Sequence, residues 1–373
     1  MKVALVHDWL NQYGGAERVL EVLHDLYPDA PIYTSIFEPK AMPAPYRTWD
    51  LRTSFMQSLP LVKRRHQPFM PLYPLAFEQF DLAGFDLVIS NASAFCHGVL
   101  TGPQTVHVCY RLTPTRFVWN YHDYVREESL GGLARRALPP VLALLRLWDR
   151  VAADRVDHFV AISQAVAGRI AKFYRRDSVV IHPPVDCSSF LPADEVGDYY
   201  LVVSRLIPYK RVDLAVRAFN ALGLPLVVAG DGRHRAALEK LARPNVRFLG
   251  RVDEAQLRDL YAHCQALIFP GEEDFGLTPL EAQASGRPVI AYAGGGALDT
   301  VVPGVTGEFF AEHSAEALAA AVERFRPESY DPRAIRANAM RFDIVAFKDR
   351  FSAFVAEKLA EVRPPERLPG PVA

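Results

Sequence analysis

Cysteine is scarce in this sequence. The four cysteines lie far apart, and no two of them have the CxxC spacing of a zinc site or a redox motif. Four are also too few for a disulfide scaffold. We therefore expect reduced thiols in a cytosolic protein, at Cys96, Cys109, Cys187 and Cys264.

An excess of charge of either sign is also missing. Lys and Arg number 42 against 43 for Asp and Glu, which leaves a formal net charge of −1. Proteins that bind nucleic acid through its phosphates usually carry a surplus of basic residues, so we expect no nucleic-acid partner. Half of the residues are apolar and 23% are charged, a mixture typical of folded globular domains.

Long hydrophobic runs are absent as well. No apolar stretch approaches the ~18 residues that a membrane span requires. The opening residues, MKVALVHDWL, hold a short apolar run that ends at His7 and Asp8. This run predicts a first β-strand instead of a signal peptide, and with it a cytoplasmic protein.

Two segments leave contact with a membrane open. Lys63-Arg64-Arg65 is a basic cluster, and Arg135-Arg136 precedes an apolar segment at residues 138–148. Such segments can place cations and apolar groups against the anionic inner face of the plasma membrane, which would make the protein peripheral. Solvated charges beside an ordinary core helix are the alternative.

The chain has 373 residues, which is enough for two domains. Short apolar runs rich in Val and Ile alternate with helical patterns, which indicates parallel sheets covered by helices. The sequence thus predicts an α/β fold with two doubly wound, Rossmann-like domains. The expected strands are residues 2–6, 86–90, 105–110, 158–162 and 179–181, then 200–204, 225–229, 245–249, 266–269 and 288–291.

We place the two domains at residues 1–190 and 191–342, because the strand pattern stops near 183–186 and then resumes. A helix over residues 343–362 has apolar positions at helical spacing, and we expect it to pack back on the first domain. Ligands bind at the carboxyl edges of parallel strands. The two domains are therefore expected to face each other across a cleft that holds the site.

The densest motif is Glu273-Asp-Phe-Gly-Leu-Thr-Pro-Leu-Glu281, which follows an expected strand. A helix should start near Thr278 or Pro279, because Pro is favoured in the first helical turn. The amides of Phe275, Gly276 and Leu277 then form an anion site. Carboxylates beside such a site suit a ligand that combines phosphate with sugar hydroxyls. An acidic helix start that serves the helix dipole is the alternative.

A basic pair opens the second domain. Arg205 ends an expected strand and Lys210 follows five residues later at the start of a helix. Two cations in this position suit a diphosphate whose charge must be neutralised. A solvated basic turn would explain the pair without any ligand.

These motifs resemble those of family 4 of the retaining glycosyltransferases with the GT-B fold. The resemblance covers nearly the whole chain and is strongest over residues 200–310. It implies that Glu281 binds the ribose of a nucleotide-sugar donor, that Glu273 contacts the donor sugar, and that Arg205 and Lys210 hold the pyrophosphate. Asp274 stands where family members usually have Gly.

Weaker parts of the resemblance add donor residues. Gly14-Gly15 is similar to the family's glycine entry, which lies near the donor phosphate, although a plain tight turn is the alternative. Gly230 lies in the turn of the nucleotide domain, and Val252 belongs to the segment whose backbone often recognises the base.

The segment Thr113-Pro114-Thr115-Arg116-Phe117-Val118-Trp119, with Tyr121 to Tyr124 beyond it, resembles bacterial mannosyltransferases of surface-polysaccharide assembly. In the first domain we expect four residues to contact the acceptor or the sugar, namely Asp8, His107, Thr113 and Arg116. Leu112 stands where many relatives have His. Either His7, His97 or His107 replaces that residue, or the donor is positioned differently.

The resemblance therefore implies a metal-independent hexosyltransferase without a cofactor. It moves mannose from GDP-mannose, as first choice, to a glycan or lipid-linked acceptor in polysaccharide biosynthesis, and Glu273, Arg205 and Lys210 act in catalysis. A nucleotide-sugar epimerase or phosphorylase with the same fold is one alternative. A non-catalytic, membrane-associated assembly protein is the other.

Overall fold

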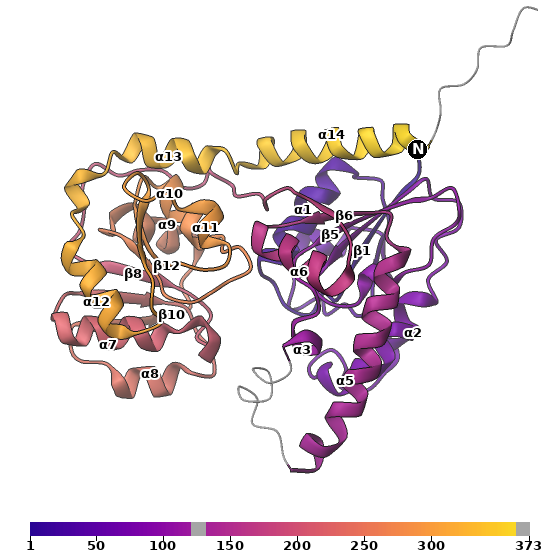
Figure 1. The fold of residues 1–373 in the computed structure, drawn as a ribbon, viewed down its shortest axis with the longest axis horizontal. Coiled ribbons are helices and arrows are strands. Elements are labelled where there is room, and N and C mark those ends of the chain that lie inside the picture. The colour runs from indigo at the N-terminus through magenta and orange to yellow at the C-terminus, as the bar shows by residue number, and fades with distance from the viewer. Residues whose placement is uncertain (121–131, 363–373) are drawn as a thin grey trace, which may run out of the picture. The chain divides into compact units, whose positions relative to one another are not determined.

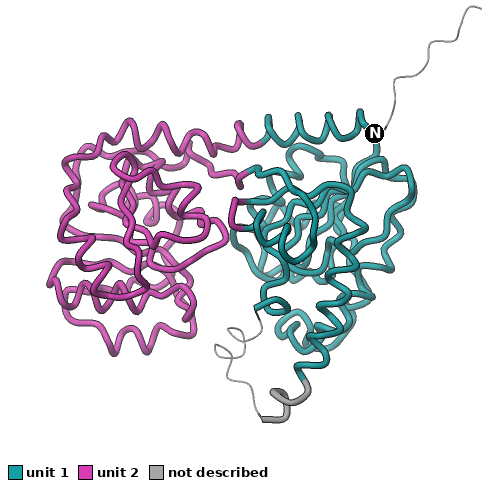
Figure 2. The backbone as a smooth tube through the Cα atoms, in the orientation of Figure 1, with its two compact units in different colours: residues 1–162, 166–181, 348–373 teal, residues 163–165, 182–347 magenta. Residues whose placement is uncertain are grey.

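The computed structural model describes residues 1–120 and 132–362 (Figure 1). The motif residues 121–124, the Pro-rich tail and the side chains of Arg135 and Arg136 lie outside this part. The chain forms two compact units, coloured separately in Figure 2. Unit 1 contains residues 1–162, 166–181 and 348–373, and unit 2 contains residues 163–165 and 182–347.

Unit 1 is built on a seven-stranded parallel sheet with the order β3-β2-β1-β4-β5-β6-β7. Its strands are β1 (Val3–His7), β2 (Ile32–Thr34), β3 (Leu51–Thr53), β4 (Leu87–Ala92), β5 (Val106–Arg111), β6 (His158–Ala161) and β7 (Ser178–Val180). Its helices are α1 (Gly15–Leu26), α2 (Tyr73–Glu78), α3 (Arg116–Trp119), α5 (Gly132–Ala152) and α6 (Gln164–Tyr174). The central strands are buried on both faces, which is why they read as continuous apolar runs.

Unit 2 is built on a six-stranded parallel sheet with the order β10-β9-β8-β11-β12-β13. Its strands are β8 (Tyr200–Val203), β9 (Leu226–Ala229), β10 (Val246–Gly250), β11 (Leu267–Phe269), β12 (Val289–Tyr292) and β13 (Gly307–Phe310). Helices cover both faces of the sheet in Figure 1. They are α7 (Val212–Leu222), α8 (Arg235–Leu241), α9 (Glu254–His263), α10 (Thr278–Ala284), α11 (Ala297–Thr300), α12 (Ala315–Arg324) and α13 (Pro332–Met340).

The predicted pair of doubly wound α/β domains is therefore confirmed, and most expected strands lie within a residue or two of their observed positions. Three strands were not predicted, namely β2, β3 and β13. β2 (Ile-Tyr-Thr) and β3 (Leu-Arg-Thr) are short and interrupted by polar residues, so they form no apolar run. β13 begins at Gly307, and glycine is depleted in strands.

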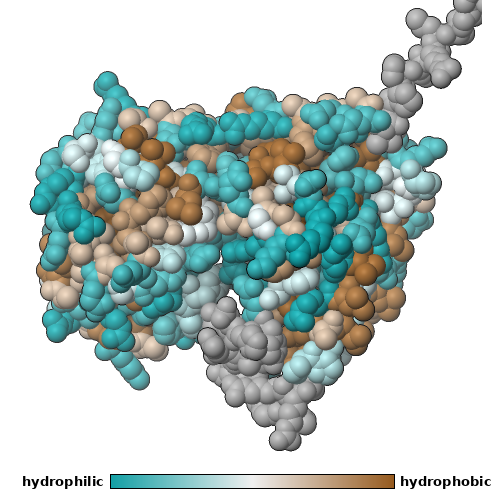
Figure 3. Space-filling model, viewed as in Figure 1, coloured by the Kyte–Doolittle hydropathy of each residue, from teal (hydrophilic) through white to brown (hydrophobic). Residues whose placement is uncertain are grey.

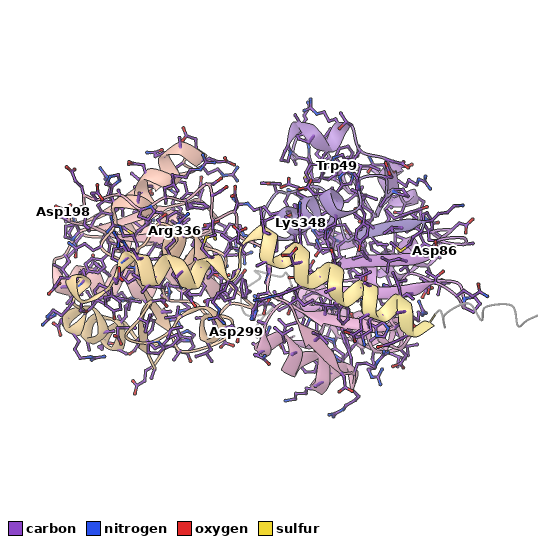
Figure 4. The ribbon with its side chains drawn as sticks, turned by 90° about the horizontal axis from the view of Figure 1, so that it is seen from above. Trp49, Asp86, Asp198, Asp299, Arg336 and Lys348 are labelled. Carbon is purple, nitrogen blue, oxygen red and sulfur yellow. The ribbon has the colours of Figure 1, made fainter. Side chains whose placement is uncertain are left out.

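The first unit ends at residue 181, whereas the sequence placed the boundary at 190. Residues 182–190 belong to unit 2 because they bond to its last segments. The Val185 amide donates to the Phe342 carbonyl oxygen at 2.9 Å. Arg336 of α13, labelled in Figure 4, donates to the carbonyl oxygens of Cys187 and Phe190.

The last helix, α14 (Ile344–Val362), contributes its residues from Lys348 onward to unit 1. Phe351 packs edge-on against Tyr110 of β5, and Phe354 packs edge-on against His158 of β6. Lys348, labelled in Figure 4, lies 3.4 Å from a carboxylate oxygen of Asp25 on α1. The apolar face of α14 thus covers the sheet of unit 1.

No helix in the described ranges is both long enough and apolar enough to cross a membrane. The four cysteines are free and buried.

Candidate functional site

Unit 2 has a switch point between β8 and β11. From β8 the chain moves outward through β9 and β10, and then returns to the other side of β8 to form β11, β12 and β13. The loops that follow the carboxyl ends of β8 and β11 therefore run in opposite directions along the sheet. In open α/β sheets this place binds ligands.

The two charged motifs of unit 2 meet at this switch point. Lys210 ends the short 3₁₀ helix Pro208–Lys210 that follows β8, and Glu273 lies in the loop that follows β11. The Lys210 ammonium group and the Glu273 carboxylate form an ion pair. Their side chains keep 14% and 20% of their exposure, so a ligand can reach both from solvent.

Glycines let the neighbouring loops approach this pair. Gly230 follows β9 with φ of 126°, and a Cβ atom there would lie 1.9 Å from the Ser204 carbonyl oxygen. Gly295 follows β12, and its Cβ would lie 2.1 Å from the Glu273 carbonyl oxygen. The Gly296 amide donates to that same oxygen at 2.9 Å. The glycines after β12 thus fix the backbone of Glu273.

Glu281 has a different environment from Glu273. It is the fourth of the seven residues of α10, is 4% exposed, and accepts a hydrogen bond of 2.8 Å from the Tyr261 hydroxyl. Glu273 is partly exposed and Glu281 is deeper. A role for Tyr261 was not predicted. It is one of the buried residues of α9, and only its hydroxyl distinguishes it from an ordinary core residue in the sequence.

The loop before α10 offers backbone amides. α10 begins at Thr278 with Pro in its first turn, which confirms the predicted start. Within the described ranges, the amides of Phe275, Gly276 and Leu277 donate to no other group. Because α10 has only seven residues, these free amides and not a long helix dipole are what the loop presents to an anion. The Phe275 side chain is buried and stacks on His182.

The remaining donor residues of unit 2 lie along the same edge. Arg205 is exposed two residues beyond β8, and Val252 is half-buried two residues beyond β10. Across residues 1–120 and 132–362, no cluster of three or more His, Cys, Asp or Glu side chains is arranged to hold a metal ion.

The equivalent switch point of unit 1 lies between β1 and β4, and it contains Asp8. Asp8 is 1% exposed, and its two carboxylate oxygens accept hydrogen bonds from the amides of Ser93, Ala94, Phe95 and Cys96 and from the Ser93 hydroxyl, at 2.6–2.9 Å. The proposed acceptor role of Asp8 is therefore corrected. This carboxylate is saturated by the backbone of the loop after β4 and holds that loop in place.

His107 is a second correction. It is the second residue of β5, near the strand's amino end, and is fully buried. Its Nε2 lies 2.8 Å from the Ser90 hydroxyl. Burial, with a contribution from nearby His97, lowers the pKa of His107 to about 3. His107 is thus a neutral core residue far along the strand from the edge where an acceptor would bind.

The other two histidines considered as replacements at Leu112 are also buried. His7 Nδ1 accepts from the Asn91 amide at 3.3 Å, and its Nε2 lies 3.4 Å from Glu17. His97 contacts Arg111 at 3.0 Å, and burial followed by that positive charge lowers its pKa to about 3. None of the three reaches the surface, which leaves a different donor position as the remaining alternative.

The other predicted residues of unit 1 do lie at carboxyl edges. Gly14 precedes α1 and Gly15 is its first residue. Thr113 follows β5 and accepts from Arg169 at 3.4 Å, and Arg116 opens α3. Their binding roles stay predictions.

Asp149, which the sequence gave no reason to select, fixes the start of α3. It is fully buried on α5, and its carboxylate accepts from the Thr115 hydroxyl at 2.6 Å and from the Trp119 indole at 2.7 Å. Burial raises the pKa of Asp149, while the positive charge of Arg111 acts in the opposite direction. One buried network of charged and hydrogen-bonded side chains therefore holds the segment after β5 in place.

Two family models match consecutive parts of the chain. Residues 13–189 match the model described as Glycosyltransferase Family 4, and residues 189–342 match Glycosyl transferases group 1. Together the matches run through both units.

Curated relatives are similar over part of the chain. D-inositol 3-phosphate glycosyltransferase of Mycolicibacterium paratuberculosis is 31% identical over 210 residues, 48% of each chain. O-antigen chain mannosyltransferase RfbU of Salmonella typhimurium is 29% identical over 157 residues, 38% of this chain and 43% of that one. The chain thus spans about half the length of the curated relatives it matches.

Solved structures share the fold over nearly the whole chain. Sucrose-phosphate synthase from Thermosynechococcus elongatus has a TM-score of 0.75 at 16% identity, covering 97% of this chain and 100% of that one. Anabaena Alr3699/HepE in complex with UDP has a TM-score of 0.71 at 17% identity, covering 96% and 100%. At these identities the likeness shows the fold alone.

Proposed function

Because the chain belongs to the GT-B-fold glycosyltransferases whose two halves these family models describe, we propose that it transfers a sugar from a nucleotide-sugar donor to a glycan or lipid-linked acceptor. The observation that carries the proposal is the ion pair of Lys210 and Glu273 at the switch point of unit 2. It places a cation for phosphate and an acceptor for sugar hydroxyls within reach of one ligand.

In the proposed reaction, Lys210 and Arg205 neutralise the diphosphate of the donor, and the free amides before α10 add hydrogen bonds to it. The bond between the anomeric carbon and the diphosphate oxygen breaks. The acceptor oxygen attacks from the same face, and its proton passes to the departing phosphate, so the anomeric configuration is retained. Glu273 orients the sugar, and Glu281 accepts hydrogen bonds from the ribose.

No metal is needed in this scheme, because side-chain cations replace it. For the donor, GDP-mannose is the first choice, since the name of the similar protein RfbU specifies a mannosyltransferase. Uridine nucleotides are the second, since HepE was crystallised with UDP and with UDP-glucose. A peripheral position at the inner membrane face suits a lipid-linked acceptor.

The test is a thermal-shift panel of nucleotide diphosphates and nucleotide sugars, each with and without EDTA. A ligand at 100 times its Kd stabilises the folded protein by about 2.7 kcal/mol. We expect at least one nucleotide to stabilise unit 2 equally with and without EDTA. Lys210→Ala should abolish that shift, and Lys240→Ala, which removes an exposed lysine from α8, should leave it unchanged.

Two results would contradict the proposal. If EDTA abolishes the shift and magnesium restores it, the metal-independent scheme is wrong. If no nucleotide stabilises the wild type, unit 2 does not bind a nucleotide-sugar donor, and the assembly-protein alternative gains support.

A further inference from the structure

Arg235, the first residue of α8, lies in an unusual place for a surface arginine. Its guanidinium group packs so closely on Gly250, the last residue of β10, that a Cβ atom on Gly250 would be 2.7 Å from Nη1 of Arg235. Gly250 also has φ of 73°, a conformation that favours glycine. The place that a side chain would occupy at Gly250 is therefore taken by the guanidinium group.

Gly250 lies at the carboxyl edge of the sheet of unit 2. A bulge in β10 sets Gly250 opposite Ala229, the last residue of β9, and the Gly230 amide donates to the Gly250 carbonyl oxygen at 2.7 Å. The loops after β9 and β10 therefore leave the sheet at the same level. The guanidinium group of Arg235 thus lies at the same edge of the sheet as the switch point.

Carboxylates on both sides hold the guanidinium group but leave its terminal nitrogens available. Its Nε donates to Glu239, one turn further along α8, at 2.7 Å. Asp231 lies 3.8 Å from Nη1, which is too far for a hydrogen bond. In the part of the chain that the structure describes, the two terminal nitrogens of Arg235 donate to no other group.

A ligand can reach these nitrogens from solvent. The side chain of Arg235 keeps 33% of its exposure. Figure 3 shows mainly hydrophilic surface over the lower end of unit 2, where Figure 1 places α8. This surface therefore suits a polar ligand.

The base of a bound nucleotide would extend to this edge. In the proposed scheme Lys210 holds the diphosphate and Glu281 holds the ribose, so the base lies beyond the ribose. Tyr261, which donates to Glu281, belongs to α9, and α9 follows β10 after the loop 251–253. The ribose site is therefore flanked by the helix that leaves β10. The next part of the edge is the carboxyl end of β10, where Arg235 lies.

The chemistry of a guanidinium group limits which base it can recognise. Arginine carries only donors, and its planar fork pairs with two acceptors that lie side by side. Guanine presents such a pair in O6 and N7. Adenine places an amino donor beside N7, and uracil presents O4 as its single acceptor on the corresponding edge. Only guanine thus satisfies both terminal nitrogens.

We infer that Arg235 selects a guanine nucleotide as the donor, by donating hydrogen bonds from its two terminal nitrogens to O6 and N7 of the base. The inference deepens the proposed function and rests on it, because without a nucleotide-sugar donor there is no base to recognise. It adds the residue that distinguishes guanosine donors from uridine donors. Glu239 keeps the fork in one orientation through the bond to Nε.

The test is titration calorimetry of the full chain with GDP, ADP, UDP and 7-deaza-GDP, in which a C–H group replaces N7. We expect the wild type to bind GDP at least about tenfold more tightly than 7-deaza-GDP or ADP, the scale at which a bidentate arginine discriminates between bases. UDP should also bind more weakly than GDP. The comparison of GDP with 7-deaza-GDP changes the ligand and not the protein, so it does not depend on the folding of a variant.

Arg235→Ala removes the fork. In this variant the preference for GDP over 7-deaza-GDP should disappear, because neither ligand then meets a donor at N7. The matched control is Arg258→Ala, since Arg258 forms the same kind of ion pair on α9, with Glu254 at 2.9 Å. The control should keep the wild-type preference. Thermal unfolding checks that both variants are folded.

Three results would overturn the inference. The first is equal binding of GDP and 7-deaza-GDP by the wild type, and the second is a wild type that prefers UDP. The third is an Arg235→Ala protein that loses affinity for all four nucleotides equally, since Arg235 would then act on the ribose or phosphates that they share.

The same titrations keep the inference apart from the proposed function. Protein that binds no nucleotide at all would remove the proposed function, and the inference with it. Protein that binds nucleotides without a preference among the bases would remove the role of Arg235 alone.

Discussion

Each unit places a carboxylate at the switch point of its sheet, and the two units use it in opposite ways. In unit 1, Asp8 follows the first strand of the sheet and spends both oxygens on hydrogen bonds from the loop after β4. In unit 2, Glu273 follows β11 and is paired with a single partly exposed lysine. Both sheets separate their loops at this point, so both could bind a ligand on topology alone.

The difference shows that topology offers a site and hydrogen bonding decides whether it stays open. Asp8 could meet a ligand only by breaking several charge-assisted bonds, which are worth roughly 1.5–3 kcal/mol each. Lys210 and Glu273 are held by one ion pair with each other, so a diphosphate that binds Lys210 has that single contact to replace. Unit 1 therefore contributes a rigid loop, and unit 2 contributes exchangeable charges.

The largest expected effect comes from Asp8→Asn. The new amide group would face backbone N–H donors that had a carboxylate oxygen, and at least two bonds would be lost. We expect the free energy of unfolding of unit 1 to fall by about 3 kcal/mol or more. All four tryptophans lie in unit 1, so urea unfolding followed by tryptophan fluorescence reports this unit alone.

Asp154→Asn is the matched control, because Asp154 is exposed and only pairs with Arg150 at the surface. Its loss should cost less than about 1 kcal/mol. If Asp8→Asn behaves like this control, the loop after β4 does not depend on Asp8, and the contrast between the two switch points fails.

The second effect concerns Glu273 and is expected in transfer and not in folding. Glu273→Gln keeps the shape of the side chain but removes the charge that orients the sugar. We expect transfer to fall by about 10²-fold, the scale of losing one preorganised electrostatic contact. Affinity for the free nucleotide diphosphate should not fall, because that ligand lacks the transferred sugar that Glu273 contacts.

Glu281→Ala is the counterpart that sharpens this assignment. Glu281 is buried and oriented by Tyr261, and in the proposed scheme it contacts the ribose. Its loss should therefore weaken nucleotide binding by about one to two orders of magnitude. Titration calorimetry with free nucleotide measures both variants. Equal losses of nucleotide affinity in the two would mean that the glutamates share one role.

The sequence predicted the placement of Lys210 and Glu273 in unit 2 more closely than that of Asp8 in unit 1, for a physical reason. Lys210, Glu273 and Glu281 are charged residues beside glycines, and their chemistry shows in the motif itself. Asp8 looks equally polar in the sequence. Only the loop at Ser93–Cys96, distant along the chain, shows that its charge is already used.

The fold shows the same limit. Strands such as β1 and β5 are long and buried, so their apolar runs predict them within a residue or two. β2 and β3 are three residues long and exist because their backbones pair with β1 and with each other. The equally short β11 was predicted because all three of its residues, Leu-Ile-Phe, are apolar, whereas β3 (Leu-Arg-Thr) has one apolar residue. The predicted role of His107 was wrong for a related reason, since the distance of this residue from the sheet edge depends on where the whole strand begins and ends.

The effect that is smallest near neutral pH is on the acid sensitivity of unit 1. His107 has a pKa lowered to about 3 by burial, against an ordinary value of 6.5 in the unfolded chain. Between these values the unfolded chain takes up a proton that the folded protein does not. The free energy of unfolding therefore falls as the pH falls through this window, by up to about 1.4 kcal/mol per pH unit for this one group.

The variant His107→Gln isolates this contribution. Asp149 titrates with the opposite sign, because burial raises its pKa and the folded protein binds its proton more readily. Its share is the same in the wild type and the variant, so it cancels in the difference between their unfolding free energies. That difference, followed by tryptophan fluorescence as the pH is lowered from 6.5, should change by about 1 kcal/mol per pH unit in favour of the variant. A constant difference would mean that His107 takes up a proton as readily in the folded unit as in the unfolded chain. The site beside Ser90 would then be more accessible to water than its buried hydrogen bond indicates.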